Sequence, residues 1–247
     1  MVITVRKTVH VTLPTRLAAA EEIHAHLADQ LNLALRRPGM HGGETALRIL
    51  IDHLLFMERE PEAWAELQQD WENRGLWTPT GIAGALHDLF PAQADCNDTA
   101  SVYAEFVHRR GWLKPDRVLT RQEYKTLTRR VRQWAAADHT WPDVTAEFGP
   151  PSVLSGGNNP PYGKTLSYLT QDPQQPIVAF HLWNGSEPGT KPWPPEHEQP
   201  LLLAARFGSN SFSRSLTFTP EGKQRKPTGH PGSAQQAVGA KPHRTRA

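Results

Sequence analysis

The sequence predicts an α+β protein in which an N-terminal multi-helix region packs on a small C-terminal antiparallel sheet, followed by a disordered basic tail. Apolar residues recur at intervals of three and four before residue 149 and at intervals of two after residue 163. The segment between them, GPPSVLSGGNNPPYG, is rich in residues that interrupt regular structure. From residue 221 onward Val238 is the only large apolar residue, which is typical of disorder.

Helices are predicted wherever apolar residues line one side of a helical wheel. The first opens at Pro14-Thr15 and runs to Arg37, with Leu27 and Leu31 in its apolar stripe. The further helices are expected at 44–59, 61–75, 82–89, 99–110, 120–137 and 142–148. Before them, the β-branched residues among the first dozen predict a strand or short hairpin.

Local signals mark several helix boundaries. Pro38-Gly39 ends the first helix, and Gly75 suits the end of the third. Thr120 and Glu123 match a capping box, in which each side chain accepts a hydrogen bond from the other residue's backbone N–H. A helix is therefore expected to begin at Thr120.

Four strands are predicted after the Gly- and Pro-rich segment, at 165–169, 177–183, 201–207 and 213–219. The sequence GSNS at 208–211 suits a hairpin loop between the last two. Serine and threonine alternate with larger residues in the last strand, which predicts a sheet with one face exposed to water. The Pro-rich loop 185–200 is expected to be extended and exposed.

We divide the chain into a mainly helical region, 1–148, a sheet region, 149–220, and the basic tail, 221–247. The first two are expected to form one domain, because a four-stranded sheet needs other elements to cover its apolar face. The strand side chains expected to pack on the helices are Val178, Phe180, Leu182, Leu216 and Phe218.

Composition excludes several classes of protein. Cys96 is the only cysteine, which rules out an intrachain disulfide framework and a Cys-based zinc module. Arg6 and Lys7 stand where a signal peptide needs apolar residues, and the best apolar run, 49–57, is too short to span a bilayer. We expect a cytoplasmic protein with no membrane partner. The 19 Arg against 8 Lys favour a GC-rich bacterial genome.

No catalytic residue, metal ligand or cofactor is assigned from the sequence. Gly163-Lys164-Thr165 lacks the glycine that a phosphate loop needs five positions earlier, and the residues after it predict a strand where that loop needs a helix. No two histidines stand four apart, and there is no cysteine pair to complete a metal site.

Positive charge is unevenly distributed, although the net charge is only +2. Residues 1–100 carry 8 Lys and Arg against 14 Asp and Glu, whereas 101–150 carry 9 against 6 and 221–247 carry 6 against 1. Such an asymmetry can mark a polyanionic partner.

The helix beginning at Thr120 places four cations within about 80° of one another on a helical wheel, opposite its apolar residues. These four are Arg121, Lys125, Arg129 and Arg132. Cations arranged in this way can neutralise phosphates without reading bases. We therefore predict a non-enzymatic accessory or regulatory protein that contacts nucleic acid through these four residues, with further cations upstream at 109–117.

Three alternatives stand beside this prediction. The same helix face can be an ordinary solvated surface that balances the acidic N-terminal helices. The chain can be a protein-interaction or immunity-type module whose partner is another protein bound by the sheet edge and the Pro-rich loop. It can also be an enzyme with a site between helices and sheet, around the 156–163 loop, Tyr162 and His181. The position of His181 in a strand is more typical of a hydrogen-bonded sheet residue.

Trp141–Pro151 and the strands that end near Trp183-Asn184-Gly185 resemble the helix, Gly-x-Pro turn and meander of the BamE/SmpA-type outer-membrane lipoprotein modules. The resemblance covers residues 141–185 and rests on spacing. It implies a helix followed by an antiparallel meander and transfers no functional residue. We expect neither that family's function nor its location, because the chain shows no lipoprotein signal.

Overall fold

The apolar stripes of the N-terminal helices meet in one core. The computed structural model describes residues 18–91, 95–185, 195, 197–208 and 211–227. Leu31, Leu54 and Trp71, from three different helices, are among its fully buried side chains. The helices of this half are α1 (Ala20–Arg36), α2 (Gly43–Glu58), α3 (Glu62–Asn73), α4 (Ile82–His87) and α5 (Asp95–Arg109), with the 3-10 turn η1 (Pro38–Met40) after α1.

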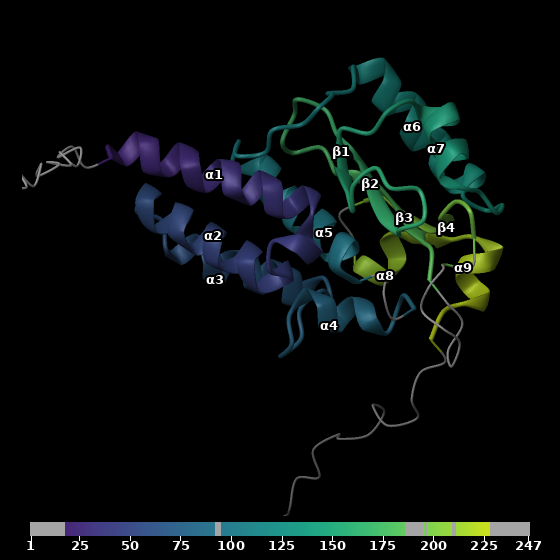
Figure 1. Ribbon diagram of the computed structural model, residues 1–247, viewed down its shortest axis with the longest axis horizontal. Coiled ribbons are helices and arrows are strands. Elements are labelled where there is room, and N and C mark those ends of the chain that lie inside the picture. Colours follow the sequence, from purple (N-terminus) through teal and green to yellow (C-terminus); the bar gives the residue numbers. More distant parts are fainter. Residues whose placement is uncertain (1–17, 92–94, 186–194, 196, 209–210, 228–247) are drawn as a thin grey trace, which may run out of the picture.

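The C-terminal half contains a five-stranded antiparallel sheet whose spatial order follows the sequence. Its strands are β1 (Val153–Ser155), β2 (Lys164–Tyr168), β3 (Val178–Trp183), β4 (Leu201–Arg206) and β5 (Leu216–Phe218). The predicted α+β class is therefore confirmed, with most helices before the sheet (Figure 1). The helix and meander implied for 141–185 are also present, as α7 (Trp141–Phe148) and β1 to β3.

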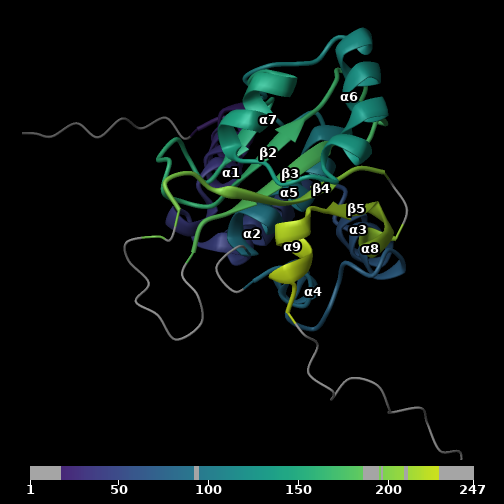
Figure 2. The same ribbon diagram turned by 90° about the vertical axis from the view of Figure 1, so that its right-hand side faces the viewer.

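Helices cover both faces of the sheet. On one face lie α6 (Arg121–Trp134) and α7, whose Leu127, Val131 and Val144 pack with Phe180 of β3. On the other face α5 lies against the strands, between the sheet and the remaining N-terminal helices (Figures 1 and 2). As predicted, Val178, Phe180 and Leu182 are buried under helices.

The prediction of one water-exposed sheet face is wrong. Every residue of β2 and β3 is buried, because α5 covers one side of the sheet and α6 and α7 cover the other. Thr165, Ser167 and His181, which lie on the α5 side, are polar and yet at most 1 % exposed. These three residues therefore belong to a buried polar interface between α5 and the sheet.

The last predicted strand, 213–219, is shorter than expected. Residues Phe212–Ser215 form a helical turn, α8, and only Leu216–Phe218 pair with β4. Phe212 is 1 % exposed, its N–H donates to the Arg74 carbonyl oxygen, and its ring lies 5.5 Å from the Arg206 guanidinium. These long-range contacts determine the backbone there and override the local alternation.

Other boundaries also differ from the predictions. Helix α5 begins at Asp95 rather than Thr99, and β1 lies inside the segment that was expected to be a loop. The region predicted to be a tail begins with an ordered helix, α9 (Pro220–Gln224), in which Gly222 packs so closely that a Cβ would lie 1.9 Å from the Leu203 carbonyl oxygen.

Several predictions fall outside the described residues. They concern the N-terminal strand, most of the Pro-rich loop, the tip of the 208–211 hairpin loop and the tail from residue 228. Within the described part of the chain, no helix combines the length and the apolar character needed to cross a bilayer.

Candidate functional site

Helix α6 is anchored by one face. Leu127 and Val131 are at most 2 % exposed, and the Tyr124 hydroxyl donates a 2.6 Å hydrogen bond to the Pro176 carbonyl oxygen. The predicted capping box is present: Thr120 Oγ1 accepts from the Glu123 N–H at 3.2 Å, and Glu123 Oε2 accepts from the Thr120 N–H at 2.7 Å. These contacts determine which way the opposite face points.

The four predicted cations lie on that opposite face. Arg121, Lys125, Arg129 and Arg132 are all exposed, and none of their side chains forms an ion pair or hydrogen bond with another described residue. From the helical rise, the row extends about 17 Å along the helix. We call these four residues the α6 basic face.

Of the other cations in this region, all but the exposed Arg109 are paired with acids among the described residues. Arg110 pairs with Glu58 and Glu60, and Lys114 with Asp29, all on or next to the N-terminal helices. The two remaining pairs are Arg117 with Glu123 and Arg130 with Glu147. Compensation by the acidic N-terminal helices therefore applies to Arg110 and Lys114 and does not extend to the α6 basic face.

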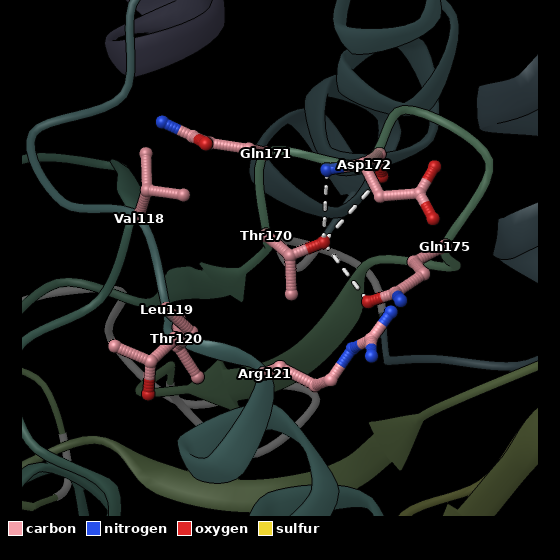
Figure 3. A pocket seen from close by; sticks show the side chains of 8 residues that line it. All are labelled: Val118, Leu119, Thr120, Arg121, Thr170, Gln171, Asp172 and Gln175. Carbon is pink, nitrogen blue, oxygen red and sulfur yellow. Dashed lines mark hydrogen bonds between the residues drawn. The ribbon is translucent and has the colours of Figure 1, made fainter.

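A pocket of about 490 Å³ opens at the N-terminal end of the α6 basic face (Figure 3). Two segments line it: 118–121, which leads into α6, and residues 170, 171, 172 and 175 of the loop between β2 and β3. Arg121 belongs both to the basic face and to the pocket. This pocket leaves no local mark in the sequence, because its two walls lie about 50 residues apart in the chain.

A buried polar layer joins α5 to the sheet. His181 Nδ1 lies 2.6 Å from Asp98 Oδ1, and the Thr165 hydroxyl donates to the same oxygen at 2.5 Å. One helical turn further, the Ser101 hydroxyl and backbone carbonyl oxygens both accept from Arg206 Nη2, at 3.2 Å each. Asp98, Ser101 and Glu105 are three and four residues apart, so they lie on one side of α5, where they meet the polar side chains of the sheet.

The charged centre of this layer is the Glu105 carboxylate, which pairs with Arg206 and lies 3.3 Å from Arg74. Although burial alone would raise the pKa of Glu105, the two guanidinium groups lower it overall. Arg206 is 1 % exposed, and the Glu105 side chain is 15 % exposed, so the pair is largely buried.

The enzyme hypothesis placed a site around Tyr162 and His181. Tyr162 is 48 % exposed, whereas His181 is 1 % exposed and its ring packs 5.0 Å from that of Phe90. Its Nε2 has no hydrogen-bond partner among the described residues. His181 is thus a hydrogen-bonded sheet residue, as its strand position indicates. Its partner Asp98 was missed, although the polar spacing along α5 is visible in the sequence.

Lys164, from the rejected phosphate-loop triplet, begins β2 and is 1 % exposed. Its ammonium group donates to the carbonyl oxygens of Asn159 (2.9 Å) and Gly157 (3.3 Å) and lies 3.8 Å from the centre of the Trp141 ring. Burial lowers the pKa of Lys164 to about 8. The lysine attaches the 157–159 loop to α7.

Neither protein-family models, nor curated proteins, nor solved structures gave a match to this chain. Among the described residues, no group of three or more His, Cys, Asp or Glu side chains is placed to hold a metal ion.

Proposed function

We propose that this protein is a non-enzymatic accessory or regulatory protein that contacts nucleic acid through the α6 basic face. The observation that carries the proposal is a contrast within one region. Arg121, Lys125, Arg129 and Arg132 are exposed without an acidic partner among the described residues, whereas Arg110, Lys114, Arg117 and Arg130 in the same region are paired. Arg109 is also exposed without such a partner, but it belongs to α5 and lies outside this row. As part of the same proposal, we place the protein in the bacterial cytoplasm, supported by the single cysteine and the excess of arginine.

The energetic argument follows from counterion release. A cation without a carboxylate partner can replace the counterions condensed on a phosphate backbone, whereas a paired cation must first give up its ion pair. Three of the four residues are arginines, whose planar guanidinium groups can bind a phosphate by two hydrogen bonds. Four such contacts predict a slope of about −3.6 for log Kobs against log salt concentration with duplex DNA, and about −2.8 with a single strand.

The burial of the other polar groups supports a non-enzymatic role. Asp98, His181, Glu105 and Arg206 have the chemistry of acid–base or charge-stabilising groups, but the exposed fraction of each of these side chains is 15 % or less, and each bonds to another of them. They connect α5 to the sheet.

A salt titration tests the proposal. Fluorescence anisotropy with labelled duplex and single-stranded oligonucleotides should show binding that weakens with salt at the slopes given above. Reversal of all four charges, by Arg121→Glu, Lys125→Glu, Arg129→Glu and Arg132→Glu, should abolish the salt-sensitive binding.

The matched control substitutes three exposed, uncharged residues of the same helix, by Gln122→Ala, Thr126→Ala and Gln133→Ala. This variant should bind as the unmodified protein does, and circular dichroism should show that both variants are folded. Salt-independent binding, or equal loss of affinity in the two variants, would refute the proposal.

A further inference from the structure

We infer that the nucleic acid held by the α6 basic face is single-stranded, and that the pocket at the N-terminal end of α6 receives one of its unpaired bases. This inference rests on the proposed function and goes beyond it by naming the form of the ligand. Arg121 connects the two sites, because its side chain lines the pocket and also begins the row of cations (Figure 3). A strand whose phosphates follow the row therefore passes the opening of the pocket.

The lining suits a base better than it suits a phosphate. A base needs apolar or planar surface for its faces and mixed donors and acceptors for its edge. Val118 and Leu119 supply apolar surface, and the guanidinium of Arg121 can stack on a base. Gln171 and Asp172 add an amide and a carboxylate. The volume, about 490 Å³, falls in the range of about 300–1,000 Å³ typical of small-ligand sites.

Asp172 argues against a phosphate in the pocket itself. Its carboxylate is exposed, so a phosphate beside it would meet like charge, whereas the N–H groups on a base edge can donate to it. The start of α6 also disfavours a phosphate, because the Glu123 carboxylate of the capping box already lies there and would repel a second anion.

The wall that carries Gln171 and Asp172 is held in place before any ligand arrives. The Thr170 hydroxyl donates to Gln175 Oε1 at 2.9 Å and accepts from the Asp172 N–H at 3.2 Å. Asp172 Oδ1 accepts from the Gln174 N–H at 2.9 Å, and Oδ2 has no hydrogen-bond partner among the described residues. A preformed wall reduces the ordering cost of binding.

A duplex does not meet these requirements. Its bases are paired and stacked, so one would have to be flipped out at a cost of a few kcal/mol before it could enter the pocket. A single strand presents its bases without that cost. If the pocket binds one of them, whatever its identity, the protein's affinity for the strand increases to a measurable extent.

The test compares an ordinary single-stranded oligonucleotide with an abasic strand of the same length, which keeps the phosphates and lacks the bases. The unmodified protein should bind the ordinary strand about tenfold more tightly, as expected for one recognised base. The variant Gln171→Ala/Asp172→Asn should bring this ratio close to one. The asparagine keeps the side-chain oxygen that bonds Gln174, and the ratio cancels the effect of the lost charge on phosphate binding.

The matched control is Gln174→Ala, an exposed residue of the same loop that does not line this pocket, and it should keep the tenfold ratio. Equal binding of ordinary and abasic strands by the unmodified protein, or tighter binding of a duplex, would overturn the inference while salt-sensitive binding preserves the proposed function. Absence of salt-sensitive binding to every probe would overturn both.

Discussion

Lys164 shows how much one residue's role depends on its surroundings. In sequence it belongs to a Gly-Lys-Thr triplet, but in the structure its ammonium group donates to two loop carbonyl oxygens and lies over Trp141. No acidic side chain accepts from it among the described residues. Burial of an ammonium without a counter-charge favours the neutral amine, which explains why its pKa falls to about 8.

This pKa predicts a particular pH dependence of stability. Between pH 8 and about 10 the folded state holds Lys164 largely neutral, while the unfolded chain still carries its proton. The folded state therefore binds fewer protons, and its stability should rise with pH, by at most about 1.4 kcal/mol per pH unit. Urea unfolding of the unmodified protein and of Lys164→Met at several pH values measures the effect as a difference.

The difference in unfolding free energy between the unmodified protein and Lys164→Met removes the contribution of other titrating groups. These include the buried tyrosines, whose raised pKa values lower stability at higher pH. Lys164→Met keeps a long apolar side chain and loses only the titrating group. A pH-independent difference between the two proteins would contradict the assignment.

At the scale of elements, α6 was the most predictable part of the fold. Its start, its apolar stripe and its cationic face all follow from a period of 3.6 residues and one capping box. The last strand was less predictable. Its Ser/Thr alternation extends over 213–219, yet the contacts of Phe212 hold the first residues in a helical turn. Local pattern therefore determines an element only where no long-range contact opposes it.

The cap of α6 supplies a prediction at this scale. Thr120→Ala removes the acceptor for the Glu123 N–H and should lower the free energy of unfolding by about 1 kcal/mol. Thr126→Ala is the matched control, because that hydroxyl donates only to the Gln122 carbonyl oxygen within the helix and alanine is a better helix former. Urea unfolding of both variants should show a loss for Thr120→Ala alone, and equal stabilities would be inconsistent with the cap.

At the scale of the whole molecule, α5 is the helix that joins the N-terminal core to the sheet. Its polar side chains bond to polar residues of β2, β3 and β4, so both sheet faces are covered but by different chemistry. The face under α6 and α7 is apolar, and the face under α5 combines apolar contacts with buried ion pairs. Buried polar groups of this kind require matched partners.

The Glu105–Arg206 pair tests this arrangement. Removing one partner, by Glu105→Leu or by Arg206→Met, leaves a buried charge without full compensation and should cost about 3–5 kcal/mol of unfolding free energy. The double variant should lose clearly less than the sum of the two single losses, because neither charge is then left alone. Arg74 keeps Asp70, 3.6 Å away, as a partner in each case. Additive losses in a urea-unfolding cycle would show that the pair is not coupled.

The sequence by itself determined the α+β class, most helices and strands, and the one-sided row of cations on α6, because these features follow from periodicities of neighbouring residues. Only the tertiary structure decided which cations keep an acidic partner, since Arg110 and Lys114 meet carboxylates 50 or more residues away. It also decided that both sheet faces are covered, and it created the pocket beside Arg121 by bringing 118–121 next to 170–175. Ion pairs and pockets arise from packing between distant segments, and a local pattern carries no record of that packing.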